Sequence, residues 1–143
     1  MTAGIASADG LKQAIRNTLL QSDGVYDIVG PAVYGNHAQT DDMSTVEFPH
    51  VVIEFYLGDT MPPVGSFQKV IFELWCFHRE SSSACLRLYD ACFAALQNQF
   101  LNVEGIGTKG ACTEMNRPTE GFYEMPRAYF SHGRWLGRAL TLS

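Results

Sequence analysis

The first apolar pattern along the chain is helical. Small or apolar residues recur at Leu11, Ala14, Ile15, Thr18 and Leu19, which is the stripe of an amphipathic helix. Turn-forming residues at 21–24 end this pattern. We expect the next five residues, 25–29, to form a short turn.

A second helical pattern follows three serines at 81–83, each of which is a suitable N-cap. One narrow stripe is expected to be buried, and its members are Leu86, Tyr89, Phe93, Leu96 and Phe100. Cys85 and Cys92 border this stripe, so we interpret them as buried thiols rather than reactive ones.

Alternating apolar residues predict two strands. Segment 50–57 has apolar residues at all its odd positions, and segment 67–77 continues the same pattern over a longer span. The predicted core face consists of Val51, Ile53, Phe55, Val70, Phe72 and Leu74. The buried stripe of the second helix should pack on this face.

The opposite face of the longer strand has a mixed composition. It presents Ile71, Trp75 and Phe77 beside two charged residues, Lys69 and Glu73. Large apolar side chains each gain about 1.5 to 3 kcal/mol from burial, so something should cover this face. Either the same chain or a neighbouring subunit can do so.

Three further strands are expected. They are a short one at 32–34, one at 109–115 and a long one at 127–142. Within the last segment, Gly133 and Gly137 predict a bend or a bulge.

Three long polar connections, 35–47, 58–66 and 116–126, separate these elements. Long connections in a compact domain are often functional, so we expect them to contact partners. Together with the mixed strand face, they supply the candidate interface residues. These are Ile71, Trp75, Phe77, Asp41, Asp42, Met61, Phe122 and Tyr123.

The order of the elements predicts an α+β fold, with two helices packed on one face of a mainly antiparallel sheet. The 143 residues suit a single domain that spans 1–143. Charged residues make up 17% of the chain, below the roughly 25% of typical soluble proteins, which favours a surface covered by partners.

The net charge of -5 and the scattered cations argue against a direct grip on nucleic acid. No apolar run approaches the about 18 residues of a membrane span, and we expect neither a signal peptide nor membrane contact. The four cysteines match no zinc pattern. Cys76, His78 and Cys112 form the only conceivable metal cluster, and we expect no metal or other cofactor.

Catalytic constellations are also not expected. No Ser or Cys nucleophile stands in the sharp turn that a hydrolase site needs. The adjacent Asp41 and Asp42 are interpreted as solvated loop carboxylates. Residues 105–110 match the spacing of a dinucleotide fingerprint, but they follow a helix and lead into a strand, which is the reverse of the required context.

The order and spacing of five segments resemble a known family. They are LKQAIRNTLL, DGVYDIVGPAVYG, FPHVVIEF, a long strand that ends in LWCFHRE, and the helix LRLYDACFAALQNQF. In this order they look like the tail terminator or tail-completion (neck) proteins of siphophages and gene transfer agents. The long acidic insertion at 40–47 and the Pro-rich connection after 116 depart from that family.

The resemblance implies a structural virion protein, not an enzyme. It would be assembled in the host cytoplasm into the tail or neck of the particle, as a homo-hexameric ring that caps the tail tube and joins the head. The implied partners are other copies of this chain, the tail tube protein and a head connector or stopper protein. DNA would pass through the lumen without specific binding. A head-completion protein stays open as an alternative, as does a small-ligand-binding module or enzyme.

Overall fold

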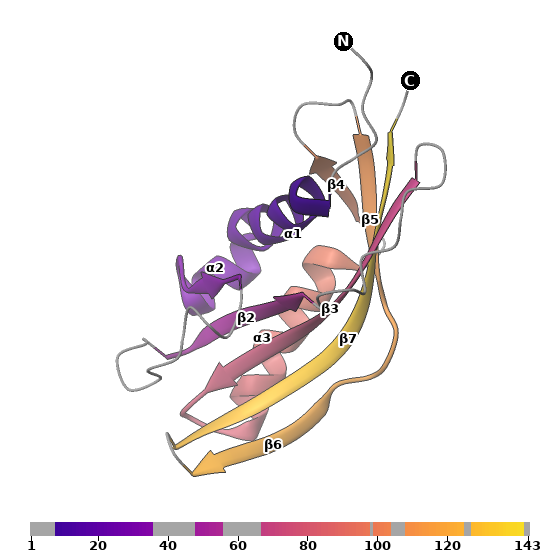
Figure 1. Ribbon diagram of the computed structural model, residues 1–143. Coiled ribbons are helices and arrows are strands. Elements are labelled where there is room, and N and C mark those ends of the chain that lie inside the picture. The colour runs from indigo at the N-terminus through magenta and orange to yellow at the C-terminus, as the bar shows by residue number, and fades with distance from the viewer. Residues whose placement is uncertain are drawn as a thin grey trace.

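The structure is a computed structural model that describes residues 8–35, 48–55, 67–97, 99–103, 108–124 and 127–141. Within these residues the chain forms three helices and a seven-stranded sheet (Figure 1). The helices are α1 (Ala8–Gln21), α2 (Asp23–Val29) and α3 (Ser82–Leu96). The strands are β1 (Val33–Tyr34), β2 (His50–Phe55), β3 (Phe67–His78), β4 (Phe100–Val103), β5 (Thr108–Glu114), β6 (Thr119–Glu124) and β7 (Arg127–Thr141). The predicted α+β class is confirmed, and α2 adds a third helix to the two that were expected.

Strands β3 and β7 form the centre of the sheet. Neighbouring strands follow the order β1-β2-β3-β7-β5-β4, and β6 also pairs with β7, beyond the end of β5. Among the described strands, β1 and β2 pair in parallel and all other pairs are antiparallel. β3 is in register with β7 along its whole length, from Phe67 opposite Leu140 to His78 opposite Tyr129.

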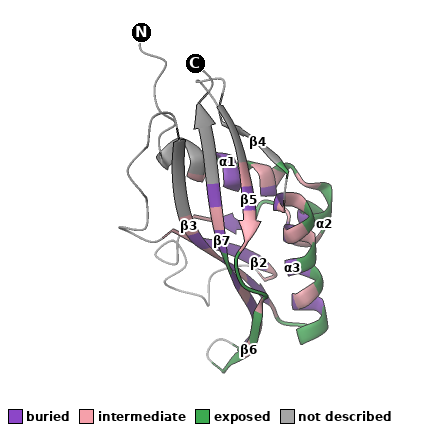
Figure 2. Cartoon of the chain, turned by 90° about the vertical axis from the view of Figure 1, so that its right-hand side faces the viewer, coloured by how far each residue is buried: buried purple, intermediate pink, exposed green. Residues whose placement is uncertain are grey.

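The described helices lie on one side of the sheet, which we call the inner face (Figure 2). Alternate residues of β3, namely Phe72, Leu74 and Cys76, point to this face and are fully buried. They share one hydrophobic core with Ile15 of α1, Val25 of α2 and the buried side of α3. The core predicted from strand alternation is confirmed at Val51, Ile53, Phe72 and Leu74, which are fully buried, and Phe55 is partly buried. The side chain of Val70 lies outside the described residues.

Helix α3 begins after Ser81, whose hydroxyl accepts a hydrogen bond of 3.0 Å from the backbone N–H of Ala84. Its buried residues are Ala84, Cys85, Leu88, Tyr89, Cys92 and Leu96. Of the predicted stripe, Tyr89 and Leu96 are buried, Leu86 and Phe93 are only partly buried, and Phe100 lies in β4 beyond the helix. The small side chains of Cys85 and Cys92 lie at the centre of the buried stripe, where they let the helix approach the sheet closely.

The predicted turn at 25–29 is wrong, because these residues belong to α2. The hydroxyl of Ser22 accepts a hydrogen bond of 3.5 Å from the N–H of Val25 and caps the helix. Gly30 ends it with a φ of 60°, where its N–H donates to the carbonyl of Tyr26 at 2.7 Å. A glycine stands here because other residues rarely adopt a positive φ.

Two further expectations near the C-terminus are corrected. The connection 116–126 is not a structureless loop, because β6 forms within it and pairs with β7. Of the bend or bulge predicted at Gly133 and Gly137, the bulge is wrong, since β7 continues its register with β3 without an extra residue. Gly133 instead leaves room for a tyrosine, because a Cβ at this position would lie 2.1 Å from the hydroxyl oxygen of Tyr89.

The connections 35–47 and 58–66 lie almost entirely outside the described residues. None of the helices in the described ranges is both long enough and apolar enough to cross a membrane.

Candidate assembly surface

Aromatic rings gather on the outer face, the side of the sheet opposite the helices. Trp75 of β3 stacks on His132 of β7, with 4.1 Å between ring centroids and planes within 7° of each other. The indole also contacts Phe130 at 5.5 Å and Phe77 at 6.0 Å, and its Nε1 donates a hydrogen bond of 3.0 Å to Glu73. Cross-strand ring pairs of this kind stabilise a sheet and fix the orientation of the rings.

One end of this ring cluster is covered by the chain itself. His50 of β2 stacks on Phe77 at 4.8 Å, and Phe48 meets His50 edge-on at 4.7 Å. The guanidinium of Arg79 lies 4.2 Å from the centre of the Phe48 ring. Phe77 is accordingly only 1% exposed, and His50 is fully buried.

Strand β6 forms the exposed margin of the cluster. Tyr123 contacts Phe77 at 6.1 Å and Phe130 at 4.9 Å, yet it is 40% exposed. Phe122 points to the other side of the strand, contacts Tyr129 at 4.8 Å and is 42% exposed. Consecutive strand residues point to opposite faces, so β6 exposes one aromatic ring on each of its sides, and either ring is available to a partner.

The structure brings together part of the predicted interface. Trp75, Phe77 and Tyr123 belong to one ring cluster, and Ile71 lies on the same face, partly buried, opposite Leu136 of β7. Phe122 shares β6 with Tyr123 but faces away from the cluster. The remaining candidates lie outside the described residues, and they are Asp41, Asp42 and Met61.

Two exposed apolar residues were missed by the sequence analysis. Tyr26 of α2 is 52% exposed and lies between Asp23 and Asp27, both also exposed. If residues 23–29 are interpreted as a helix, helical spacing places Tyr26 next to Asp23 on its surface. Met115 is 49% exposed directly after β5. It is the last residue of the predicted strand 109–115, but the sequence analysis did not identify its side chain as exposed.

A pocket of about 300 Å³ opens where β5 leaves β7 and β6 joins it. The N–H of Met115 still donates to the carbonyl of Arg134 at 2.7 Å, and pairing resumes with Thr119 opposite His132. The lining residues are Glu73, Asn116, Arg117, Thr119, His132, Gly133 and Arg134. Each of the two lining arginines lies near a carboxylate, Arg117 near Glu114 and Arg134 near Glu73. Their side chains are still 70% and 46% exposed, so both guanidiniums can also bind an anionic group.

One imidazole nitrogen beside this pocket is buried. Nδ1 of His132 has no hydrogen-bond partner among the described residues. The flat contact with Trp75 holds this imidazole in place, and the nearby Arg134 lies 3.9 Å from Glu73. The pocket thus combines a held imidazole with a guanidinium whose side chain is still 46% exposed.

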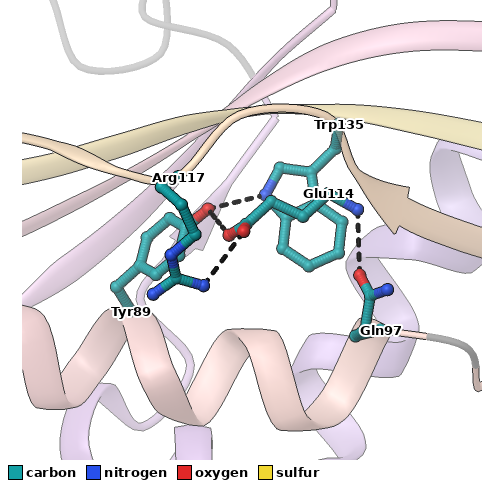
Figure 3. A network of polar contacts seen from close by, with 5 residues as sticks. All are labelled: Tyr89, Gln97, Glu114, Arg117 and Trp135. Carbon is teal, nitrogen blue, oxygen red and sulfur yellow. Dashed lines mark hydrogen bonds and ion pairs between the residues drawn. The ribbon is translucent and has the colours of Figure 1, made fainter.

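A polar network fastens the strand beside the pocket to α3 (Figure 3). Tyr89 donates its hydroxyl proton to Glu114 at 2.6 Å and accepts a hydrogen bond from Trp135 Nε1 at 3.1 Å. Arg117 pairs with the same carboxylate at 3.0 Å, and the side-chain oxygen of Gln97 accepts the N–H of Glu114 at 2.9 Å. Burial, together with the bond to Glu114, raises the pKa of Tyr89, so its phenol remains a protonated donor.

Buried thiols lie on the inner face. Sγ of Cys76 and Sγ of Cys92 are 4.0 Å apart, and Cys85 donates to the carbonyl of Cys76 at 3.1 Å. Burial raises the pKa of Cys76 and of Cys85, which keeps both thiols protonated and weakly nucleophilic. Within the described ranges, no three His, Cys, Asp or Glu residues are grouped so as to hold a metal ion.

Comparison with known proteins finds a similar fold in a solved assembly. No family model and no curated protein sequence matches it. Among solved structures, it is similar to a chain in the virion of a native gene transfer agent particle, with a TM-score of 0.71 and 15% sequence identity. The match covers 96% of this chain and 99% of that chain. At this identity the likeness shows a shared fold.

Proposed function

We propose that this protein is a structural virion component that forms a ring at the head-proximal end of a phage-type tail tube. The observation that carries the proposal is the fold match to a gene transfer agent virion chain, which spans nearly the whole of both chains. The entire chain, as one domain of residues 1–143, would then be the repeating unit of the ring. Within this class, the tail terminator family is favoured by the order and spacing of the five sequence segments that resemble it.

The proposed role needs binding surfaces rather than catalysis. Burial raises the pKa of Cys76, Cys85 and Tyr89, which keeps these three side chains protonated and weakly nucleophilic. The exposed apolar residues are instead displayed on separate surfaces, α2 and the 115–123 segment. This arrangement suits a protein that contacts several neighbours, including the tube protein and a head connector.

A ring is the form that the role requires. A cap on a rotationally symmetric tube must match the tube's symmetry, and head-to-tail contacts between identical subunits close when the rotation is a whole fraction of a turn. We therefore propose a homo-hexamer within the virion, assembled in the host cytoplasm. The net charge of -5 suits a lumen through which DNA passes, because like charges do not hold phosphates.

The test is electron microscopy of particles made with and without the gene for this protein. Loss of a tail terminator should leave overlong tails, and supplying the wild-type gene separately should restore the normal tail length. Averaged images of normal particles should also show one ring of this chain at the upper end of the tail. Normal tails beside leaky heads would instead identify a head-completion protein, and absence of the chain from purified particles would reject a structural role.

A further inference from the structure

The exposed face of α2 combines an aromatic ring with negative charge. Tyr26 is 52% exposed, compared with 49% for Met115 and 42% for Phe122. Asp23 lies three residues before Tyr26, and Asp27 lies directly after it. All three residues are exposed, and Asp23 neighbours both of the others on the helix surface. We call these three residues the α2 knob.

The pocket between β5 and β6 has the complementary chemistry. Arg117 and Arg134 line it, the side chain of Arg117 is 70% exposed, and Met115 adds an exposed apolar side chain beside it. Its volume of about 300 Å³ is large enough for an aromatic side chain. His132, held flat against Trp75, gives the pocket a fixed wall.

The two surfaces lie on opposite sides of the molecule. In Figure 1, α2 is on the side of β2, whereas the connection from β5 to β6 runs along the far side of β7. A contact between them therefore joins two copies rather than two parts of one copy. Such a contact joins two different surfaces, so it is head-to-tail. Repeated from copy to copy, a head-to-tail contact can close a ring.

We infer that the α2 knob of one subunit docks in the β5–β6 pocket of the next copy. The carboxylates of the knob meet the arginines of the pocket, and the Tyr26 ring covers Met115 and the pocket wall. Opposite charges on the two surfaces fix which sides of neighbouring subunits meet and disfavour like-with-like contacts. This inference rests on the proposed ring and specifies its contact surfaces.

A pair of cysteines tests the contact directly. Asp27→Cys and Arg134→Cys combined in one chain should give disulfide-linked multimers, up to the full ring, when assembled particles are oxidised and run without reductant. The four native cysteines are buried, so they should not contribute. Either substitution alone should give only monomers, because a head-to-tail contact never places two copies of the same position together.

The outcomes separate this inference from the proposed function. A visible ring without cross-linked multimers, although both introduced thiols react with a maleimide, overturns the contact and leaves the ring intact. A dimer from either single substitution also overturns it, since that result means a symmetric contact. Particles whose tails carry no ring of this chain reject the proposed function itself.

A charge reversal gives a second test that needs no new disulfide. Asp27→Arg places a cation near the C-terminal end of α2, where the helix dipole tolerates it, so the fold should persist. The fraction of particles with normal tails should fall on the order of tenfold, because the arginines would face a like charge. The matched control is Asp90→Arg on the exposed side of α3, which should keep normal tails. Equal effects of the two reversals would overturn the contact.

Discussion

On its inner face the sheet presents aliphatic, thiol and aromatic side chains to three helices, whereas on its outer face it presents rings that stack mainly on one another. Trp135 on the inner face is fully buried beneath α3, with Phe72 at 6.2 Å and Phe93 at 5.8 Å. Trp75 on the outer face is only partly buried, although it has more ring neighbours. Ring stacking alone therefore does not complete the burial of a sheet face.

This difference separates stability from assembly. The inner face holds the fold together through burial that involves all the helices. The outer face and its margin in β6 retain accessible apolar area, which becomes useful when another molecule covers it. Substitutions on the two faces should thus affect different measurements.

The sharpest contrast is between the two tryptophans. Trp135→Ala should lower the free energy of unfolding by about 3 to 5 kcal/mol, because it leaves a cavity in the core and removes a hydrogen bond to Tyr89. Trp75→Ala should cost about 1 to 3 kcal/mol, since part of its area is already in water. Urea denaturation of both variants measures the difference, and equal losses would contradict the division between the faces.

A smaller effect is expected where the inner face leaves no room. Gly133→Ala should cost about 1 to 3 kcal/mol, because the new Cβ would fall on the Tyr89 hydroxyl. Gly24→Ala is the matched control, since its Cβ would meet its nearest atoms at 3.9 Å and lies in a helix. We expect the control to be neutral or stabilising. A Gly133 variant as stable as the wild type would show that the tyrosine moves away freely.

Because of the buried thiols, we expect the free energy of unfolding to depend on pH in the alkaline range. The pKa of Cys76 and that of Cys85 are raised in the folded state by burial, so above about pH 8.5 the unfolded chain loses protons that the folded chain keeps. Stability is therefore unaffected by these groups below that pH and falls above it, by about 1.4 kcal/mol per pH unit for each fully shifted group. Cys76→Val should flatten this fall in urea titrations at successive pH values. An unchanged slope would mean that the thiol ionises inside the fold.

The smallest change in stability is expected at the outer margin. Phe122→Ser should alter the free energy of unfolding by about 0.5 kcal/mol or less, because Phe122 is already 42% exposed and lies outside the hydrophobic core. Its effect should appear in particles instead, as fewer tails of normal length in micrographs. Arg87→Ser, on an exposed position of α3, serves as the control. Normal tails in particles with the Phe122 variant would contradict the assignment of β6 to the assembly surface.

Part of the candidate site could be predicted from the sequence. Alternation along β3 placed Ile71, Trp75 and Phe77 on one face, because successive side chains of a strand point to opposite sides. The exposed pair Phe122 and Tyr123 was also identified as a contact candidate. Its strand was missed, since the short β6 is stabilised by pairing with β7 rather than by a pattern of its own.

The sequence by itself determined the helical and strand periodicities, the two faces of β3 and therefore the α+β class. These follow from local geometry, which repeats every 3.6 or 2 residues whatever the rest of the chain does. Only the tertiary structure decided that His50 covers Phe77 and that Tyr89 needs Gly133. It also created the pocket that Arg134 lines, since its lining residues come from β3, β7, the start of β6 and the segment before it. Such contacts depend on strand order and register, which are set by hydrogen bonds between segments far apart in the chain.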